Sequence, residues 1–211
     1  MNNNIWDYFQ RKVCLSFEKR PSGKPSRWPD CEREFKRVGL TDVQRFEPVK
    51  AIGPHQSFTL SQKQILTDFL NSDSQTLLAM EDDIEFRNID PLCDAIHAIK
   101  LHGIKWDVIY LGGNIVSGIH KMVRRNLYKV QNVWTTHGVA YTRYAAQLIL
   151  SEFPNENEKM YDTYLGEILP KMNAYMIGPM VAIQRPDYSD IWQKDVDYTQ
   201  IFNNSNKRLV Q

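Results

Sequence analysis

The chain has 211 residues, of which 42% are apolar and 24% charged, a balance that excludes a largely disordered protein. The net charge of +1 excludes a general nucleic-acid binder, and three scattered cysteines exclude a disulfide framework or a closed zinc site. No apolar run approaches the ~20 residues of a membrane span, and the first residues lack a signal-peptide core. We therefore expect a soluble, cytoplasmic protein with one domain over residues 1–211, its core at about 11–200 and a polar tail at 203–211.

The basic residues are unevenly distributed. Nine lie between residues 11 and 37, against four acidic ones, and four more lie between 121 and 129 with no carboxylate among them. Such runs are typical of a solvated face. They also favour an anionic ligand, such as a nucleotide diphosphate, or peripheral contact with an anionic membrane surface.

Short apolar runs alternate with amphipathic segments along the chain, which is typical of an α/β domain. The segments predicted, in chain order, are a strand at 13–17, a helix at 28–38, a strand within 43–52, a helix at 61–70, a strand at 76–80, a helix at 90–102, a strand at 107–111, a strand or hairpin arm at 133–141, helices at 144–153 and 160–169, and one or two strands within 175–184. The chain shows no internal repeat and no linker that would divide it.

Local signals mark several ends of these segments. A Ser-x-x-Gln capping box predicts that a helix begins at Ser61. Gly39 and Gly103 are placed to end the helices before them, and Pro154 is placed to close a third. The polar residues from Asn203 onward predict a frayed tail.

Three consecutive carboxylates, Glu81, Asp82 and Asp83, directly follow the strand predicted at 76–80. Ligands of open α/β sheets bind at this carboxyl edge, and a divalent cation relieves the repulsion between neighbouring acids. Carboxylate oxygens suit Mg²⁺ or Mn²⁺, which commonly bridge to phosphate oxygens. In an extended chain Glu81 and Asp83 point the same way, so these two are predicted to face the cation. A solvated strand end whose acids cap the next turn explains the triplet equally well.

Other well-known catalytic motifs are absent from the sequence. It has no Gly-rich P-loop, no dinucleotide-binding Gly-x-Gly-x-x-Gly, no Gly-x-Ser-x-Gly elbow and no His-Glu-x-x-His. His97 and His102 are five positions apart, which is the wrong spacing for one helix face. Zinc, serine-hydrolase and simple NAD chemistry are therefore disfavoured.

A set of short segments spans nearly the whole chain, from about Val13 to Ile191. The segments are 13–20 (VCLSFEKR), 27–28 (RW), 60–62 (LSQ), 78–84 (LAMEDDI), 106–112 (WDVIYLG), 138–141 (GVAY), 145–150 (AAQLIL), 161–165 (YDTYL), 181–184 (VAIQ) and 189–191 (SDI). In content and order this set resembles glycosyltransferase family 25, which includes lipooligosaccharide and collagen sugar transferases.

That resemblance implies a single-domain GT-A fold, a Rossmann-like mixed sheet flanked by helices. It also implies metal-dependent, inverting transfer of a hexose, galactose or glucose, from a UDP-sugar to a hydroxyl of a glycan or glycoconjugate, as in lipopolysaccharide biosynthesis. Mn²⁺ or Mg²⁺ would offset charge on the departing diphosphate, while a carboxylate takes the acceptor proton. Asp162 matches the acid before the family's Tyr-Leu pair and is the expected base; an acid near a helix N-terminus explains it equally well.

The remaining candidates would surround the donor. Asp190 is the third expected metal ligand, or else it caps a turn. Arg20 and Arg27 are expected to bind the diphosphate, because guanidinium groups match phosphate oxygens bidentately. The residues expected beside the nucleotide are Phe17, Glu18, Asp82, Gly112 and Gly113.

The chain also departs from the family pattern. It has Ser61-Gln62 where Ser-His is usual, 56–59 (QSFT) where a Gly-Cys-like approach is usual, and Phe17-Glu18 in place of Asn-Leu. Donor identity and activity therefore stay open, and a non-catalytic relative that binds nucleotide or glycan is one alternative. A metal-dependent phosphoesterase or nuclease is another, although two-metal catalysis normally recruits more carboxylates and histidines.

Overall fold

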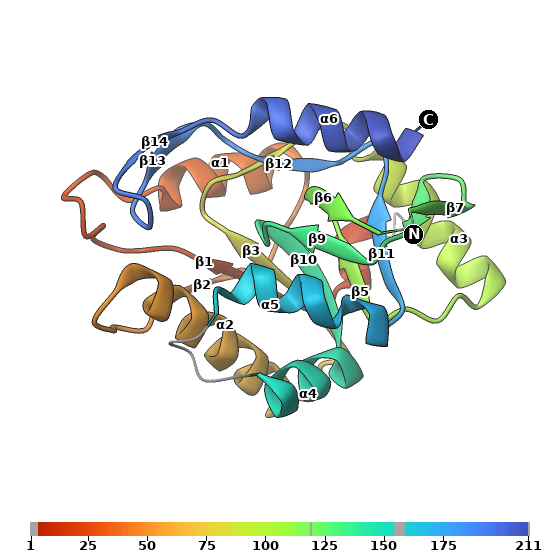
Figure 1. Ribbon diagram of the computed structural model, residues 1–211, viewed down its shortest axis with the longest axis horizontal. Coiled ribbons are helices and arrows are strands. Elements are labelled where there is room, and N and C mark those ends of the chain that lie inside the picture. The colour runs from red at the N-terminus through yellow and green to blue at the C-terminus, as the bar shows by residue number, and fades with distance from the viewer. Residues whose placement is uncertain (1–3, 119, 154–158, 211) are drawn as a thin grey trace.

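A mixed eight-stranded sheet forms the centre of the computed structural model, which describes residues 4–118, 120–153 and 159–210 (Figure 1). From one edge to the other, its strands are β2 (Val43–Phe46), β1 (Arg11–Leu15), β3 (Thr76–Glu81), β10 (Gly138–Thr142), β5 (Val108–Tyr110), β11 (Ala174–Ile177), β8 (Leu127–Lys129) and β7 (Lys121–Arg124). Strand β10 runs antiparallel to both of its neighbours, whereas β1 is parallel to β2 and β3.

Helices cover both faces of this sheet. The helices are α1 (Trp28–Arg37), α2 (Pro54–Leu70), α3 (Asp90–His102), α4 (Arg143–Glu152), α5 (Tyr161–Ile168) and α6 (Thr199–Val210), with short 3-10 turns η1 (Ile5–Tyr8) and η2 (Leu169–Lys171). The expected α/β fold, a mixed sheet flanked by helices, is confirmed. None of the helices in the described part of the chain has the length and apolar character that crossing a membrane requires.

Alternation along the strands builds one hydrophobic core on each face. In β3, Leu77 and Ala79 join the core under α2, α4 and α5, while Leu78 and Met80 join the core under η1, α1 and α3. This follows from the two-residue period of a strand, since both faces of the central strands are covered. The sheet is thereby held rigidly where its strands end.

The strand ends that matter for the site lie side by side. Leu15 at the end of β1 is the register partner of Glu81 at the end of β3. Because these two strands are parallel, the segments that follow them leave the sheet at the same edge. The acidic triplet and the loop after β1 therefore begin as neighbours.

Three two-stranded ribbons lie outside the main sheet. They are β4 (Ile84–Phe86) with β12 (Ala182–Gln184), β6 (Asn114–Ser117) with β9 (Asn132–Trp134), and β13 (Asp187–Ser189) with β14 (Lys194–Val196). Strand β4 follows the acidic triplet, and its Ile84 pairs with Gln184 of β12. The ribbon thus brings a chain segment from the C-terminal part beside the triplet.

Helix α2 begins seven residues before the predicted start at Ser61, at Pro54. Ser61 lies inside the helix, where its hydroxyl donates to the Ser57 carbonyl oxygen at 2.7 Å and accepts from the Val49 amide at 2.8 Å. Gly53 precedes the helix in an extended conformation, and proline is well tolerated in the first turn. The capping-box prediction was therefore wrong, because the Ser61 hydroxyl anchors the preceding loop instead.

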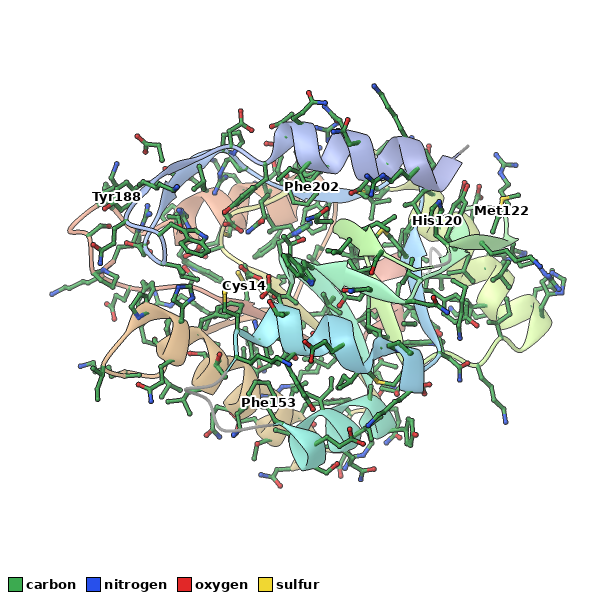
Figure 2. The ribbon with its side chains drawn as sticks, viewed as in Figure 1. Cys14, His120, Met122, Phe153, Tyr188 and Phe202 are labelled. Carbon is green, nitrogen blue, oxygen red and sulfur yellow. The ribbon has the colours of Figure 1, made fainter. Side chains whose placement is uncertain are left out.

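Two further predictions are corrected at the C-terminal half of the chain. The segment 133–141 contains parts of two strands, β9 and β10, because the backbone turns at Thr135, whose φ is 69°. The expected frayed tail is helix α6, and Phe202 and Leu209, both nearly fully buried, fix it to the core. Figure 2 shows Phe202 below α6, on its sheet side. Pro154 and residue 211 lie outside the described residues.

Candidate active site

A cavity of about 540 Å³ opens at the carboxyl edge of β1 and β3. Its lining is of two kinds, acidic and apolar. The acidic side chains are Glu81, Asp82, Asp83, Asp162, Asp187 and Asp190. The apolar and aromatic ones include Phe17, Ile52, Phe58, Tyr161, Trp192 and Tyr198. Such a mixed lining suits a ligand that carries both a charged group and a ring.

Glu81 and Asp83 each accept a hydrogen bond from a neighbouring side chain of the cavity lining. The Thr136 hydroxyl donates to Glu81 Oε1 at 2.8 Å, and Gln184 Nε2 donates to Asp83 Oδ2 at 3.1 Å. Asp83 Oδ1 is buried and has no hydrogen-bond partner. Burial, and then the charge of Asp83, raises the pKa of Glu81 well above its usual range, and burial also raises the pKa of Asp83. The pair therefore favours a ligand that supplies positive charge.

Asp162, the expected base, lies in the first turn of α5 and lines the same cavity. Its Oδ2 accepts from the Thr135 amide at 3.4 Å, and its Oδ1 accepts from the Thr163 amide at 2.7 Å. The charge of Asp162 contributes to raising the pKa of Glu81, after burial and Asp83. The structure thus brings together Glu81 and Asp83 of the acidic triplet with Asp162, which lies about 80 residues further along the chain.

The connection between β9 and β10 lines the cavity beside Glu81 and Asp162, and no sequence motif pointed to it. Besides the Thr136 contact, the His137 carbonyl accepts from the Glu81 amide at 3.1 Å. The His137 ring is fully buried, and its Nε2 donates to the Ala182 carbonyl oxygen at 3.2 Å. Burial lowers the pKa of His137 to about 4, so the imidazole is neutral at pH 7. The only signal in the sequence was the pair of polar residues between two apolar runs.

Asp82 points away from its two acidic neighbours. Its Oδ1 accepts from Arg27 Nη1 at 2.9 Å, and the Cys31 thiol donates to its carbonyl oxygen at 3.2 Å. The predicted split of the triplet, with Glu81 and Asp83 on one side, is consistent with these contacts. Asp82, expected beside the nucleotide, lines the cavity and is bound by Arg27.

Arg20 and Arg27, expected to bind a diphosphate, are both engaged by the β13–β14 hairpin. Arg20 Nε donates to Asp190 Oδ2 at 2.7 Å, and Arg27 Nε donates to Asp187 Oδ2 at 2.7 Å. Both guanidinium groups also donate to the carbonyl oxygen of Tyr188, which lies at the outer end of the molecule in Figure 2. The Arg20 side chain is only 3% exposed. A diphosphate would have to displace these internal partners.

The remaining candidates divide between the cavity and the fold. Phe17 lines the cavity, whereas the Glu18 side chain is 71% exposed and pairs with Arg45 at 3.5 Å. Gly112 and Gly113 follow β5, and a Cβ atom there would come within 2.0 Å of the Ala182 oxygen and 2.5 Å of Val133 Cγ1, respectively. Close packing therefore explains both glycines without a ligand.

A divalent cation fits two of the three predicted ligands. Among the described residues, no cluster of three or more His, Cys, Asp or Glu side chains is arranged to hold a metal. Asp190, the predicted third ligand, is bound by Arg20 and by the Ser22 amide at 3.3 Å. Two carboxylates such as Glu81 and Asp83 are enough protein ligands for Mg²⁺, because this ion is often held by one or two carboxylates together with substrate phosphates. The unpartnered Asp83 Oδ1 agrees with such a ligand.

Exposed apolar side chains border the cavity. Ile52 is fully exposed, and Trp192, at the tip of the β13–β14 hairpin, is 48% exposed. The Trp192 ring contacts the His55 ring edge to face, with centroids 5.1 Å apart. Large apolar side chains left in solvent beside a cavity commonly mark a binding surface.

The comparisons with known proteins support the fold. No family model and no curated protein matches the chain, so its resemblance to glycosyltransferase family 25 remains an interpretation of the sequence. The crystal structure of A197 from STIV is similar, with a TM-score of 0.51 and 15% identity over 88% of this chain and 93% of that one. At this identity the similarity shows a shared fold alone.

Other solved structures are similar at lower scores. The inositol-1-phosphate CTP transferase from T. maritima has a TM-score of 0.46 and 12% identity over 94% of this chain and 96% of that one. A UDP-glucose pyrophosphorylase complexed with UDP-glucose has a TM-score of 0.43 and 12% identity, covering 85% of this chain and 72% of that one.

Proposed function

We propose that this protein is a metal-dependent glycosyltransferase that moves a hexose from a UDP-sugar to a hydroxyl of a glycan or glycoconjugate. The observation that carries the proposal is the grouping of Glu81, Asp83 and Asp162 in one cavity with an apolar and aromatic lining. A nucleotide-sugar bound with a divalent cation would have both matching parts, because the cation would face the carboxylates and the diphosphate together, while the rings would lie against the apolar lining. Galactose and glucose are the sugars that the family resemblance suggests.

Glu81 and Asp83 would hold the cation. Mn²⁺ or Mg²⁺ bound there would neutralise charge that develops on the diphosphate as the bond to the sugar breaks. The chain prepares the two carboxylates for this role, because Thr136 and Gln184 each fix one oxygen. Burial raises the pKa of Glu81 and of Asp83, and a bound cation would stabilise the charged forms of both carboxylates.

Asp162 would act as the base. As the acceptor oxygen bonds to the anomeric carbon, its proton passes to the Asp162 carboxylate, and the bond from that carbon to the donor phosphate oxygen breaks with inversion. Hydrogen bonds from the Thr135 and Thr163 amides hold the carboxylate in one orientation. Such positioning is required for direct displacement.

The donor nucleoside would lie against Phe17 and the border residues Ile52 and Trp192. We do not place the diphosphate on Arg20 or Arg27, because both already bind acids of the chain. Their role in this proposal is to fasten the β13–β14 hairpin, and with it Trp192, beside the cavity.

Thermal unfolding against nucleoside diphosphates, each with Mn²⁺, with Mg²⁺ and with chelator, tests donor binding. A ligand at 100 times its dissociation constant adds about 2.7 kcal/mol to the folded state. We expect UDP to raise the unfolding midpoint only with a cation. A flat response to every nucleotide would contradict the proposal.

A product assay then tests the reaction. UDP-galactose and UDP-glucose are incubated with Mn²⁺ and a panel of sugar acceptors, and the phosphate products are identified. Release of UDP that depends on the acceptor supports sugar transfer. Release of pyrophosphate from UTP and a sugar phosphate would indicate a nucleotidyltransferase instead, and binding without any turnover would indicate a non-catalytic relative.

A further inference from the structure

Thr135 has an unusual backbone conformation for its residue type. Its φ of 69° lies in the left-handed region. Among the described residues other than glycine, Asp42, Asn126 and Gln193 also have a positive φ. Of these four, Thr135 alone is β-branched, and β-branched side chains are the least compatible with positive φ. A strained residue of this kind persists only where the surrounding structure holds it, and such residues concentrate at functional sites.

The conformation of Thr135 has a consequence for two acids of the cavity. Its amide donates to Asp162 Oδ2 at 3.4 Å, and the next residue, Thr136, donates its hydroxyl to Glu81 Oε1 at 2.8 Å. The turn therefore contacts the expected base through one residue and an expected cation ligand through the next. An extended Thr135 would continue β9 and could not direct both groups to these two acids.

The Thr135 hydroxyl is left without a partner. Its Oγ1 is buried and makes no hydrogen bond, although Thr135 lines the cavity. Asp83 Oδ1 and Gln184 Oε1, on the lining of the same cavity, are also buried and unpartnered. Buried polar atoms are nearly always paired in folded proteins, so a ligand with hydroxyl groups is the natural partner for this group of oxygens.

We propose that Thr135 is a substrate-contacting residue whose side-chain hydroxyl hydrogen-bonds the acceptor hydroxyl facing Asp162. The left-handed backbone directs the Thr135 amide to Asp162, and Thr135 itself lines the cavity with its buried hydroxyl unpartnered. Thr135 thereby fixes the acceptor oxygen for attack while Asp162 takes its proton. This inference rests on the proposed glycosyltransferase function and adds to it the residue that orients the acceptor.

Three variants separate the hydroxyl from the backbone. Thr135→Val keeps the branched shape and removes the hydroxyl, Thr135→Ser keeps the hydroxyl, and Thr135→Gly removes the hydroxyl and relieves the backbone. Asp42→Gly is the matched control, because Asp42 has a φ of 58° at an exposed position outside the cavity lining. Unfolding midpoints, the UDP–Mn²⁺ shift, KM for the acceptor and kcat are measured for each.

We expect Thr135→Val to lower kcat/KM for the acceptor roughly tenfold, and Thr135→Ser to restore most of it. The UDP–Mn²⁺ shift should be unchanged in both. Thr135→Gly should raise the unfolding midpoint more than Asp42→Gly does, while losing turnover as Thr135→Val does.

Results other than these would overturn the hydroxyl contact, the strained backbone or the proposed function, as follows. Wild-type-like turnover in Thr135→Val overturns the hydroxyl contact, and a lower midpoint in Thr135→Gly overturns the strained backbone. A wild-type protein that binds no nucleotide overturns the proposed function and the acceptor contact with it. The comparison of midpoints in the two glycine variants still decides the backbone part in that case.

Discussion

The six acids that line the cavity fall into two groups that differ in how their charge is balanced. The paired acids are Asp82, Asp187 and Asp190, which bind the buried side chains of Arg20 and Arg27. The unpaired acids are Glu81, Asp83 and Asp162, which take part in none of the ion pairs formed among the described residues.

The two groups of acids have different roles, although all six side chains are carboxylates. The paired acids fasten the β13–β14 hairpin to the start of α1 and to the end of β3, which is a structural task. The unpaired acids form no ion pair, and burial disfavours the charged forms of Glu81 and Asp83, a cost in stability that a bound cation would offset. Function is therefore assigned to the acids that form no ion pair, which separates Glu81 and Asp83 from Asp82 within the triplet.

The largest expected effect is on turnover, in Asp162→Asn. Loss of a general base typically lowers the rate by about 10² to 10⁴, while donor binding does not need this side chain. We expect that loss in kcat with an unchanged UDP–Mn²⁺ shift. The control is Glu167→Gln, an exposed acid of the same helix. If turnover survived in Asp162→Asn, another acid would have to be the base.

The next effect is on stability, in Arg27→Met. The change leaves the buried Asp82 carboxylate without its guanidinium partner, whereas Asp187 keeps Arg20 at 3.5 Å, and breaking a buried ion pair costs about 3–5 kcal/mol. Denaturant unfolding measures the loss. Arg33→Met is the control, because the Arg33 pair with Asp30 is exposed and should change stability by less than about 0.5 kcal/mol. If the two variants lost the same amount of stability, the ion pairs of Arg27 would have no special structural role, and the paired acids could not be distinguished from the unpaired ones on that ground.

The next effect tests whether the buried His137, whose carbonyl oxygen contacts the Glu81 amide, is held neutral. Its pKa is lowered from 6.5 to about 4, so the folded protein disfavours protonation, and stability is lost as the pH falls from about 6.5 towards 4. The full loss is about 3 kcal/mol. His137→Gln keeps a donor for the Ala182 carbonyl and should remove this part of the pH dependence. Unfolding midpoints at pH 7 and pH 4.5 decide; an identical pH dependence in both proteins would mean that His137 is not held neutral.

The smallest effect is expected in the double variant Glu81→Gln with Asp83→Asn. Burial and mutual repulsion disfavour the charged forms, so removing both charges should raise the unfolding midpoint without a cation by about 2–4 °C, equivalent to about 1 kcal/mol. The Mn²⁺-dependent shift with UDP should disappear. Asp82→Asn is the contrasting variant and should lower the midpoint, because it breaks the Arg27 pair. If the Mn²⁺-dependent shift were retained in the double variant, Glu81 and Asp83 would not be the residues that bind the cation.

Prediction from sequence succeeded where the signal was local. The short apolar run of β3 and the apolar periodicity of α1 and α3 identified those elements, and Gly103 ends α3 with a φ of 58° as expected. It failed at Ser61, whose apparent capping signal serves a contact with Val49, twelve positions away. It failed again at α6, where buried Phe202 and Leu209 outweigh a polar composition.

The sequence by itself determined the α/β class and the acidic triplet at the end of a strand, because periodicity and the ends of strands depend on neighbouring residues. Asp162 became a candidate through the family resemblance. The tertiary structure alone decided which acids are paired. Arg27 meets Asp187 across 160 positions of the chain, and Thr136 meets Glu81 across 55. No local pattern encodes such contacts, since they arise when the sheet and its ribbons bring distant segments to one edge. The same long-range assembly turned Arg20 and Arg27 into hairpin anchors and placed Thr135 beside the candidate base.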